Sequence, residues 1–432
     1  IVVWGEDGTN DGANIQPDGI AINNNTISNL DTSDPYAEGV GHYPLVSLST
    51  PFTVSGSALV DNLYGAAGDD VLSGLAGEDM LVGEGGNDSL SGGDDSDELY
   101  GEAGNDTLNG DAGNDSLTGG TGDDSLFGDE GTDTFIWAWG DGADQVTGGT
   151  GGVAGEGFGV GDVLAMTGTA AANSFTVTDT TVAGSETVTY SQIERLQVNG
   201  GDDTDTIAVN ALSTTTKYEI NGGSGARDHL TFAALGGAFG VTVNLSTSVF
   251  ASREGGSPNH SVTLAEDVTG SALTDVIIGN TTANVLLGGA GNDTIFGGGG
   301  GDTIEGGAGA DELQGSAGVV DQFVYRSTGE GVDLINAFNA SQDQLVIDDS
   351  FDFSALPSTL TSANFAVANV AGGSYIGGSG DPMFVLDTNL APGELRSLWY
   401  DADGNGADAV KLVEFDSSSD LNSFGHTTFL II

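Results

Sequence analysis

A nine-residue repeat between residues 65 and 136 limits the fold of this chain more than any other feature. It recurs eight times without a change of register, as in the copy GEAGNDTLN at 101–109. Position one is always glycine, position six is always aspartate, and position eight is always a large apolar residue. Glycines bend the chain and the apolar residue stays in register, so the pattern predicts a coil of short strands with a buried core. The position-six aspartates are Asp70, Asp79, Asp88, Asp97, Asp106, Asp115, Asp124 and Asp133.

The same period returns in a second block, at residues 270–323. Its regular copies place Asp293, Asp302 and Asp311 at position six. Weaker copies in and around the two blocks place Asp61, Asp275 and Asp321 at the same position.

The middle of the chain carries a weaker period of about 11 residues. Short β-prone triplets end at Val198, Val209, Ile220, Phe232 and Val243, and two degenerate nonapeptides place Asp205 and Asp228. Evenly spaced short strands are typical of solenoids, so we expect the coil to continue through the middle in a less regular form.

The charge of the chain must be balanced by cations. Seven Lys and Arg residues face 64 Asp and Glu residues, which gives a formal net charge of -57. Such a chain is not attracted to nucleic acid or to an acidic membrane. Two nonapeptides would close one coil, so aspartates eighteen residues apart would stack about 4.8 Å apart. Each bare neighbouring pair would then cost about 3 kcal/mol at an effective dielectric constant near 20.

Calcium is the cation that this residue pattern predicts. Carboxylate and turn carbonyl oxygens suit calcium, whereas zinc prefers His and Cys ligands. The chain has no cysteine and only four scattered histidines. We therefore predict several calcium ions bound by the aspartates of the regular copies. For the weaker set, an alternative in which the side chain only caps a turn stays open: Asp61, Asp205, Asp228, Asp275 and Asp321.

A separate short motif near the C-terminus has the opening of a calcium loop, in which Asp401, Asp403 and Asn405 would be ligands. Leu412 stands where the closing glutamate of such a loop is expected, so a plain hairpin turn is an equal alternative. The sequence contains neither His-Glu-x-x-His nor Gly-x-Ser-x-Gly, so it predicts neither zinc protease nor lipase chemistry. It also has no apolar stretch long enough to span a membrane.

The repeats resemble the RTX family, the calcium-binding nonapeptide proteins of bacteria with the consensus GGxGxDxUx. The resemblance implies an all-β fold, a right-handed parallel β-roll or β-solenoid with calcium ions between its turns. It also implies export by a type I secretion system that reads an uncleaved C-terminal signal. The tail at 398–406, with the apolar last four residues, is similar to the ends of such substrates.

We therefore expect five segments. They are an N-terminal β and loop segment (1–55), a first roll with its exit cap (56–149), an irregular solenoid middle (150–269), a second roll (270–323) and a C-terminal cap with the secretion signal (324–432).

Two functions fit this organisation. The first is a secreted, calcium-dependent, non-enzymatic structural protein of the cell surface, such as a surface-layer, sheath, filament or matrix subunit. Its expected partners are calcium, other copies of the chain or a cell-surface polysaccharide, and the exporter during secretion. The alternative is the C-terminal calcium-binding and secretion portion of a larger exported enzyme, toxin or adhesin, which the absence of an initiator Met favours. A hydrolase or lyase built from carboxylates of the middle segment is a third and weaker hypothesis.

Overall fold

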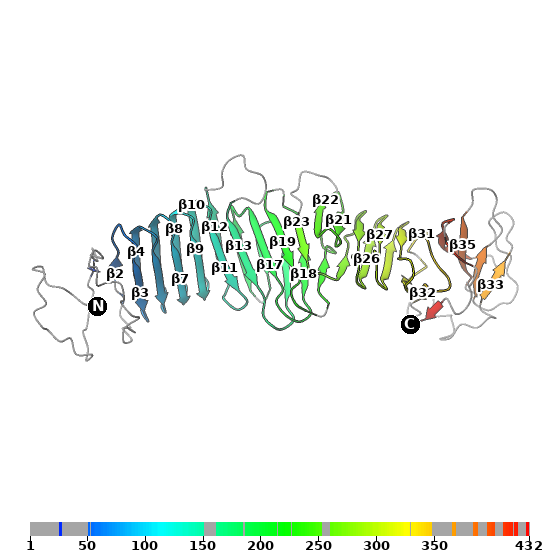
Figure 1. Ribbon diagram of the computed structural model, residues 1–432, viewed down its shortest axis with the longest axis horizontal. Helices are drawn as coiled ribbons and strands as arrows, with labels where there is room; N and C mark the ends of the chain where they lie inside the picture. The colour runs from blue at the N-terminus through cyan, green and yellow to red at the C-terminus, as the bar shows by residue number, and fades with distance from the viewer. Residues whose placement is uncertain are drawn as a thin grey trace, which may run out of the picture.

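The computed structural model describes most of the chain between residues 51 and 347, with short pieces at either end. The gaps in that range are 52, 151–160, 185, 214, 226, 253–259 and 329, and the pieces are 26–27, 365–368, 383–387, 395–401, 409–417, 419–421 and 429–431. The regular elements of these residues are all β strands and form a long rod. Along it the strands progress from β2 (Thr53–Ser55) at one end to β35 (Arg396–Asp401) at the other (Figure 1). No described segment is a helix of the length and apolar character needed to cross a membrane.

Successive strands of the first block alternate between two parallel sheets. One sheet, called sheet A, contains β2 (Thr53–Ser55), β4 (Val71–Ala76), β6 (Ser89–Asp94), β8 (Thr107–Gly113) and β10 (Ser125–Gly131). The other, called sheet B, contains β3 (Asn62–Ala66), β5 (Met80–Glu84), β7 (Glu98–Ala103), β9 (Ser116–Thr121) and β11 (Thr134–Ala138). Leu72 pairs with Leu90, and Leu81 with Leu99, so two nonapeptides make one coil as predicted.

Each nonapeptide of the first block sends its position-eight side chain into the core, and β11 adds Trp137. These position-eight side chains are 0–2% exposed. The core is therefore thin, one side chain from each nonapeptide, and it is repeated in every coil. Burial of each leucine stabilises the fold by about 1.5–3 kcal/mol. The side chains are Leu72, Leu81, Leu90, Leu99, Leu108, Leu117, Leu126 and Phe135.

The coil continues through the middle and becomes wider there. Its alternating strands are β12 (Gln145–Gly149), β13 (Val163–Thr167), β17 (Arg195–Asn199), β18 (Thr206–Val209), β19 (Lys217–Asn221) and β20 (His229–Thr231). Strands β17 to β19 each bury two side chains, for example Leu196 with Val198 and Tyr218 with Ile220. Leu196 pairs with Tyr218, so two of the predicted 11-residue units form one coil.

Two antiparallel insertions interrupt the parallel sheets, and the periodic triplets did not predict them. In sheet A, β14 (Ser174–Val177), β15 (Thr181–Ala183) and β16 (Thr187–Ser191) lie between β12 and β18. In sheet B, β21 (Val241–Asn244), β22 (Val249–Ser252) and β23 (His260–Thr263) lie between β19 and β25 (Val276–Ile278). In each insertion the last strand pairs with the earlier coil and the first strand with the later one.

The second block restores the 18-residue coil. Its strands are β24 (Asp267–Thr269), β25 (Val276–Ile278), β26 (Val285–Ala290), β27 (Thr294–Phe296), β28 (Thr303–Ala308) and β29 (Glu312–Gln314). Strands β30 (Gln322–Tyr325), β31 (Asp333–Asn336) and β32 (Gln344–Ile347) extend the two sheets by a further coil.

The C-terminal strands cover the end of the coil. β36 (Val410–Phe415) pairs with β31, and β37 (Phe429–Ile431) pairs with β32. β33 (Phe365–Ala368), β34 (Met383–Asp387) and β35 (Arg396–Asp401) extend sheet B beyond β36. The fully buried Phe338 packs between Phe323 and Phe415, with ring centroids 5.7 and 5.2 Å away, and closes the core. At the opposite end, β1 (Thr26–Ile27) pairs with β2.

Candidate metal centre

The position-six aspartate is buried at the point where each strand begins. One carboxylate oxygen, Oδ1, accepts a hydrogen bond from the backbone N–H of the aspartate one coil earlier. Asp88 donates to Asp106, and Asp106 donates to Asp124, both with N···O distances of 2.7 Å. Each carboxylate therefore ties two coils together. Two such ladders run along the rod, one where the chain enters sheet A and one where it enters sheet B.

The second carboxylate oxygen, Oδ2, is left without a partner. In the seven aspartates from Asp79 to Asp133, Oδ2 is buried and has no hydrogen-bond donor among the described residues. These aspartates are at most 3% exposed. A buried polar atom without a partner costs about 1–3 kcal/mol, and more when it carries charge. The folded chain thus presents a row of unsatisfied anionic oxygens, which is the environment a bound cation would complete.

The position-one glycine makes room for this carboxylate. A Cβ atom on Gly101 would lie 2.4 Å from Oδ2 of Asp106 and 2.4 Å from the carbonyl oxygen of Gly119. The sequence predicted that the glycines of the repeat bend the chain, but the position-one glycine does not adopt left-handed backbone. The left-handed residues stand at positions two and four, as at Glu102 (φ 74°) and Gly104 (φ 142°). At position one, side-chain and main-chain oxygens converge where only a hydrogen atom fits.

Burial also changes the protonation of the ladder. It raises the pKa of Asp88 and Asp115 to about 7, and that of Asp97 and Asp133 to about 6, against an ordinary value of 3.8. The backbone N–H donated to each carboxylate opposes this rise only in part. When no metal cation is bound, the buried carboxylates of the folded ladder would therefore be partly protonated close to neutral pH.

The structure brings the predicted aspartates of both blocks into the same arrangement. In the second block, Asp275 donates its N–H to Asp293 at 2.7 Å, and Asp293 donates to Asp311 at 2.7 Å. The ladder includes every member of the weaker set as well, all at most 3% exposed: Asp61, Asp205, Asp228, Asp275 and Asp321. Asn284 occupies position six of its repeat. It continues the ladder by donating its backbone N–H to Asp302, but its side chain carries no charge.

Further members of the ladder were not recognised as such in the sequence. Asp133 donates to Asp162 at 2.9 Å, and the N–H of Asp162 donates to Glu194 at 2.9 Å. On the other edge, Asp228 donates to Glu266 at 2.8 Å. The signal that could have found them is an acidic residue directly before each β-prone stretch. The same signal marks Asp144, Asp333 and Asp343.

A second, exposed ladder lies beside the first at position five. Asn87 donates its N–H to Asp69 at 2.8 Å, and Asn105 donates to Asn87 at 2.8 Å. Asp123 continues the row by donating to Asn105 at 3.1 Å. These bonds fix the turns from outside and explain why Asn and Asp recur at this position.

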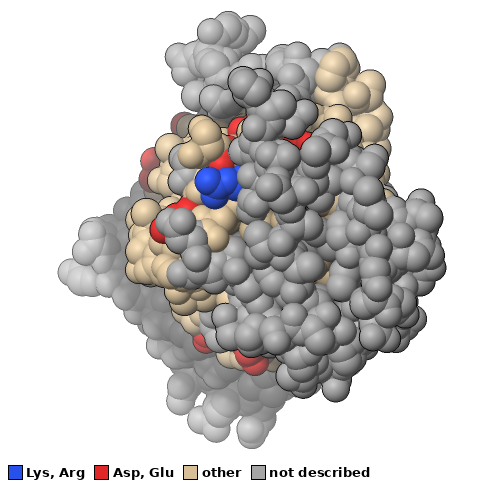
Figure 2. Space-filling view, turned by 90° about the vertical axis from the view of Figure 1, so that its right-hand side faces the viewer, with Lys and Arg blue, Asp and Glu red and all other residues tan. Residues whose placement is uncertain are grey.

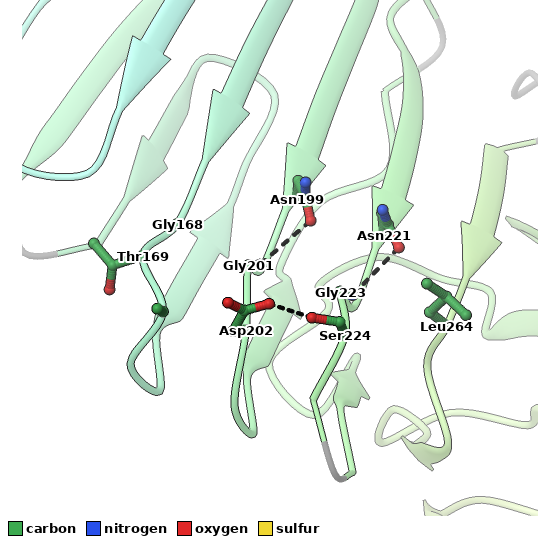
Figure 3. A pocket seen from close by; sticks show the side chains of 10 residues that line it. Gly168, Thr169, Asn199, Gly201, Asp202, Asn221, Gly223, Ser224 and Leu264 are labelled. Carbon is green, nitrogen blue, oxygen red and sulfur yellow. Dashed lines mark hydrogen bonds between the residues drawn. The ribbon is translucent and has the colours of Figure 1, made fainter.

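The turns of the middle segment enclose a shallow hollow of about 380 Å³. Asn199 and Asn221 line it, and each accepts the N–H of the glycine two residues later, at 3.3 and 3.2 Å (Figure 3). Asp202 and Ser224 are hydrogen-bonded across neighbouring coils at the same place. The hollow lies on the turns that precede Asp205 and Asp228, and these two carboxylates are themselves buried.

The C-terminal motif is not placed by the structure. Asp403 and Asn405 lie outside the described residues, and Asp401 is the last residue of β35, with its side chain not described. Figure 2 views this end of the rod, where the few basic atoms lie beside acidic ones. The short calcium loop stays a prediction.

The donor set of the ladder suits calcium. Within the described part of the chain, no three His, Cys, Asp or Glu side chains converge on one point. An ion at a coil edge would therefore draw on one or two carboxylates and complete its shell from turn carbonyl oxygens and water. Calcium accepts six to eight such oxygens in flexible geometry, whereas zinc needs nitrogen or sulfur ligands. The residues present thus fit calcium, and a Cβ at position one would block the space they leave.

Comparison with known proteins agrees with this geometry. A family model for the RTX calcium-binding nonapeptide repeat matches residues 55–90, 82–117, 109–136, 269–304 and 296–319. No curated protein matches the chain. The matched residues coincide with the two blocks of 18-residue coil, and the wider middle lies between them.

Proposed function

Because the chain is a member of the RTX family, whose repeats bind calcium and whose proteins are typically secreted by bacteria, we propose that it is a secreted structural protein of the cell surface. In this proposal it is a non-enzymatic subunit of a surface layer, sheath, filament or matrix. Its coil folds when the chain meets extracellular calcium.

One observation carries the proposal. The ladder of buried carboxylates extends beyond the matched repeats into the middle of the rod. Asp205 and Asp228 are 0 and 1% exposed, and Oδ2 of each has no hydrogen-bond donor among the described residues. A Cβ on Gly200 would lie 2.4 Å from Oδ2 of Asp205 and 2.2 Å from the carbonyl oxygen of Gly222, as at Gly101. Calcium dependence would then belong to the whole rod rather than to a small module attached to something else.

Bound calcium would supply the positive charge that the chain lacks. Several ions would be held along each edge by the position-six aspartates, by Asp205 and Asp228, and by the neighbouring turn carbonyl oxygens. Binding to the folded state alone stabilises it, so folding follows the calcium concentration. Low cytosolic calcium would keep the acidic chain unfolded for a type I exporter, and millimolar external calcium would fold it.

Electron microscopy of the purified chain tests this proposal. We expect ordered filaments or sheets in millimolar calcium, their loss on chelation, and no assembly in the same concentration of magnesium, which prefers a stricter octahedral shell. Rods that stay monodisperse at every calcium concentration would contradict a structural role. So would a gene that continues upstream of Ile1 into a catalytic or toxin domain.

A further inference from the structure

The outward side of sheet A differs from the rest of this acidic molecule. From β2 to β16, two rows of its outward positions carry no Asp, Glu, Lys or Arg, although the chain has 64 acidic residues. The acidic residues of these strands, Asp94, Asp111, Asp129 and Glu130, lie at the strand ends, beside the two rows. Parallel pairing aligns these positions in two rows, which we call the hydroxyl face. One row is Thr53, Val71, Ser89, Thr107, Ser125, Gln145 and Thr189, and the other is Ser55, Ser73, Ser91, Asn109, Phe127, Thr147 and Ser191.

The opposite sheet shows that the coil itself does not impose this composition. The corresponding positions of sheet B mix aromatic, aliphatic and charged residues, such as Tyr64, Met80, Glu98 and Ile136. Farther along, sheet B carries Arg195 and Lys217, both paired with Glu219 at 2.8 and 2.6 Å. The hydroxyl face is therefore a property of one side of the rod.

Four hydroxyl groups of this face are available to a ligand, whereas Ser91 donates its hydroxyl to Asp111. Ser73, Ser89, Thr107 and Ser125 make no side-chain hydrogen bond to any described residue. A serine or threonine hydroxyl can donate one hydrogen bond and accept two. Neighbouring strands lie about 4.8 Å apart, so the same pair of groups recurs at that interval along the rod. Val71 and Phe127, 44 and 36% exposed, add apolar contact area.

We propose that the hydroxyl face binds a neutral polysaccharide that lies along the rod axis, an inference that rests on the proposed role at the cell surface. The charge of the molecule selects this occupant. A net charge of -57 repels an acidic polymer, and a basic partner would be drawn to the acidic turns instead. A second copy would bring its own acidic edges against those of the first. A neutral glycan exchanges its water for protein hydroxyls and desolvates no ion.

The repeat of the face favours a polymer over a single sugar. Each coil offers only a few neutral hydrogen bonds, each with a net contribution of about 1 kcal/mol. A chain of sugars engages many coils at once, and the later contacts are intramolecular, so weak contacts add to a useful affinity. Because no ion pair is involved, we expect binding to be nearly independent of salt concentration.

Affinity electrophoresis of the calcium-loaded full chain in gels that contain dextran, mannan or acidic alginate tests the inference. We expect a neutral polymer to retard the chain in the gel. On a column that carries the same polymer, retention should be equal at about 0.1 M and about 0.5 M salt. Ser89→Glu with Ser125→Glu should weaken retardation at least tenfold, since both place charge on the face. The matched control, Ser116→Glu with Thr134→Glu, adds the same charge to sheet B and should bind as the parent does.

The outcomes separate this inference from the proposed function. Absence of retardation by either neutral polymer, or equal loss in both double variants, would overturn it even if calcium-dependent filaments still form. Reduced self-association of the Ser89→Glu, Ser125→Glu variant in sedimentation velocity, with unchanged retardation, would assign the face to a second copy instead. Circular dichroism of each variant in calcium shows whether the coil is intact.

Discussion

The first repeat block and the middle segment carry the same carboxylate ladder on coils of different size. In the block, each ladder bond spans 18 residues, whereas bonds in and around the middle span 29, 32, 23 and 38 residues. Strands β4 to β10 of the block bury one large side chain each, and strands β17 to β19 of the middle bury two each. The ladder is therefore built mainly from an acidic residue at the start of each strand, in most coils with a glycine facing it. The nine-residue period is the most compact way to provide them.

The two regions differ in what else holds them together. The middle has Glu219 paired with two cations, and it has antiparallel strands that do not depend on the turns. It also has an aromatic stack in which His260 lies 4.8 Å from Tyr218 and 4.9 Å from Phe250, measured between ring centroids. The block has little besides its thin core and its ladder. We infer that the block depends on calcium more strongly than the middle.

Removal of calcium should have the largest effect and should separate the two regions. With excess chelator, we expect the far-ultraviolet circular dichroism to lose most of its β signal. Hydrogen exchange followed by mass spectrometry should show residues 56–136 exchanging within seconds while 196–252 keep partial protection. Equal loss of protection in both regions would refute the difference in dependence, and an unchanged spectrum would refute calcium-driven folding.

Neutralising single ladder positions should give the next largest effect. Asp106→Asn keeps an oxygen that accepts the N–H of Asp88 but removes the charge at the unpartnered position. We expect the calcium concentration for half-folding of the block to rise about tenfold, which equals about 1.4 kcal/mol. Asp205→Asn should shift the middle and leave the block nearly unchanged.

The exposed ladder provides the control for this experiment. Asp123→Asn makes the same change of charge at an exposed position and keeps an acceptor for the N–H of Ala143. The calcium concentration for half-folding of the block should stay within twofold of the parent value, a change of about 0.4 kcal/mol or less. A shift as large as that of Asp106→Asn would mean that net charge, rather than the buried oxygen, sets the calcium requirement.

Filling the space at position one should destabilise both regions by a similar amount. Gly101→Ala and Gly200→Ala each place a Cβ within 2.5 Å of a buried carboxylate oxygen and a carbonyl oxygen. We expect a loss of about 1–3 kcal/mol in denaturant unfolding at saturating calcium. Gly85→Ala, whose nearest contact is 3.7 Å, and Gly236→Ala, with nothing within 4 Å, are the controls. Similar losses in the controls would point to chain entropy instead of space.

Acid should partly replace calcium, and more so in the block than in the middle. In the block, burial raises the pKa values of Asp88, Asp97 and Asp115 from 3.8 to about 6 or 7. The stabilisation from their protonation is therefore complete below about pH 3.8 and is lost as the pH rises through about 6 to 7. In the middle, burial lowers the pKa of His260 from 6.5 to about 4, so its contribution is lost as pH falls through that range. In chelator, a change from pH 7.5 to 5 should therefore restore protection mainly in residues 56–136.

A buried histidine supplies the check on this prediction. His260→Gln removes the titrating group and keeps an oxygen that can accept the N–H of Tyr218, as Nδ1 does at 3.0 Å. The variant should raise the protection of the middle at pH 5 relative to the parent. If acid restores both regions of the parent equally, the opposite signs assigned to the carboxylates and to His260 are wrong.

How much could be predicted differs between the two regions for a physical reason. In the block, the aspartate and the core residue of each repeat, such as Asp106 and Leu108, return every nine residues because each repeat contributes one core side chain. The sequence alone therefore predicts the strands, the coil and the ladder. In the middle, the 11-residue triplets predicted the coil, but the chain reverses within a sheet at β15 and β22. Such reversals depend on pairing between distant strands, as between Val146 and Tyr190, which no local pattern records. Glu194 and Glu266 were missed because their spacing along the chain is irregular although their spacing along the rod is not.

The smallest expected effect concerns two repeats in which position four is aspartate instead of glycine. Asp95 in the block and Asp203 in the middle both adopt left-handed backbone, with φ of 79° and 72°. Asp95→Gly should stabilise the chain by about 1 kcal/mol, because it relieves this conformation and removes a charge that repels Asp79 and Asp97. Asp203→Gly should gain less, since it also loses the hydrogen bond from the N–H of Thr204 at 2.9 Å. Asp95→Asn removes the charge and keeps the Cβ, so denaturant unfolding of the three variants separates the two causes. A destabilised Asp95→Gly would show that the aspartate is needed at this turn, in contrast to its middle counterpart.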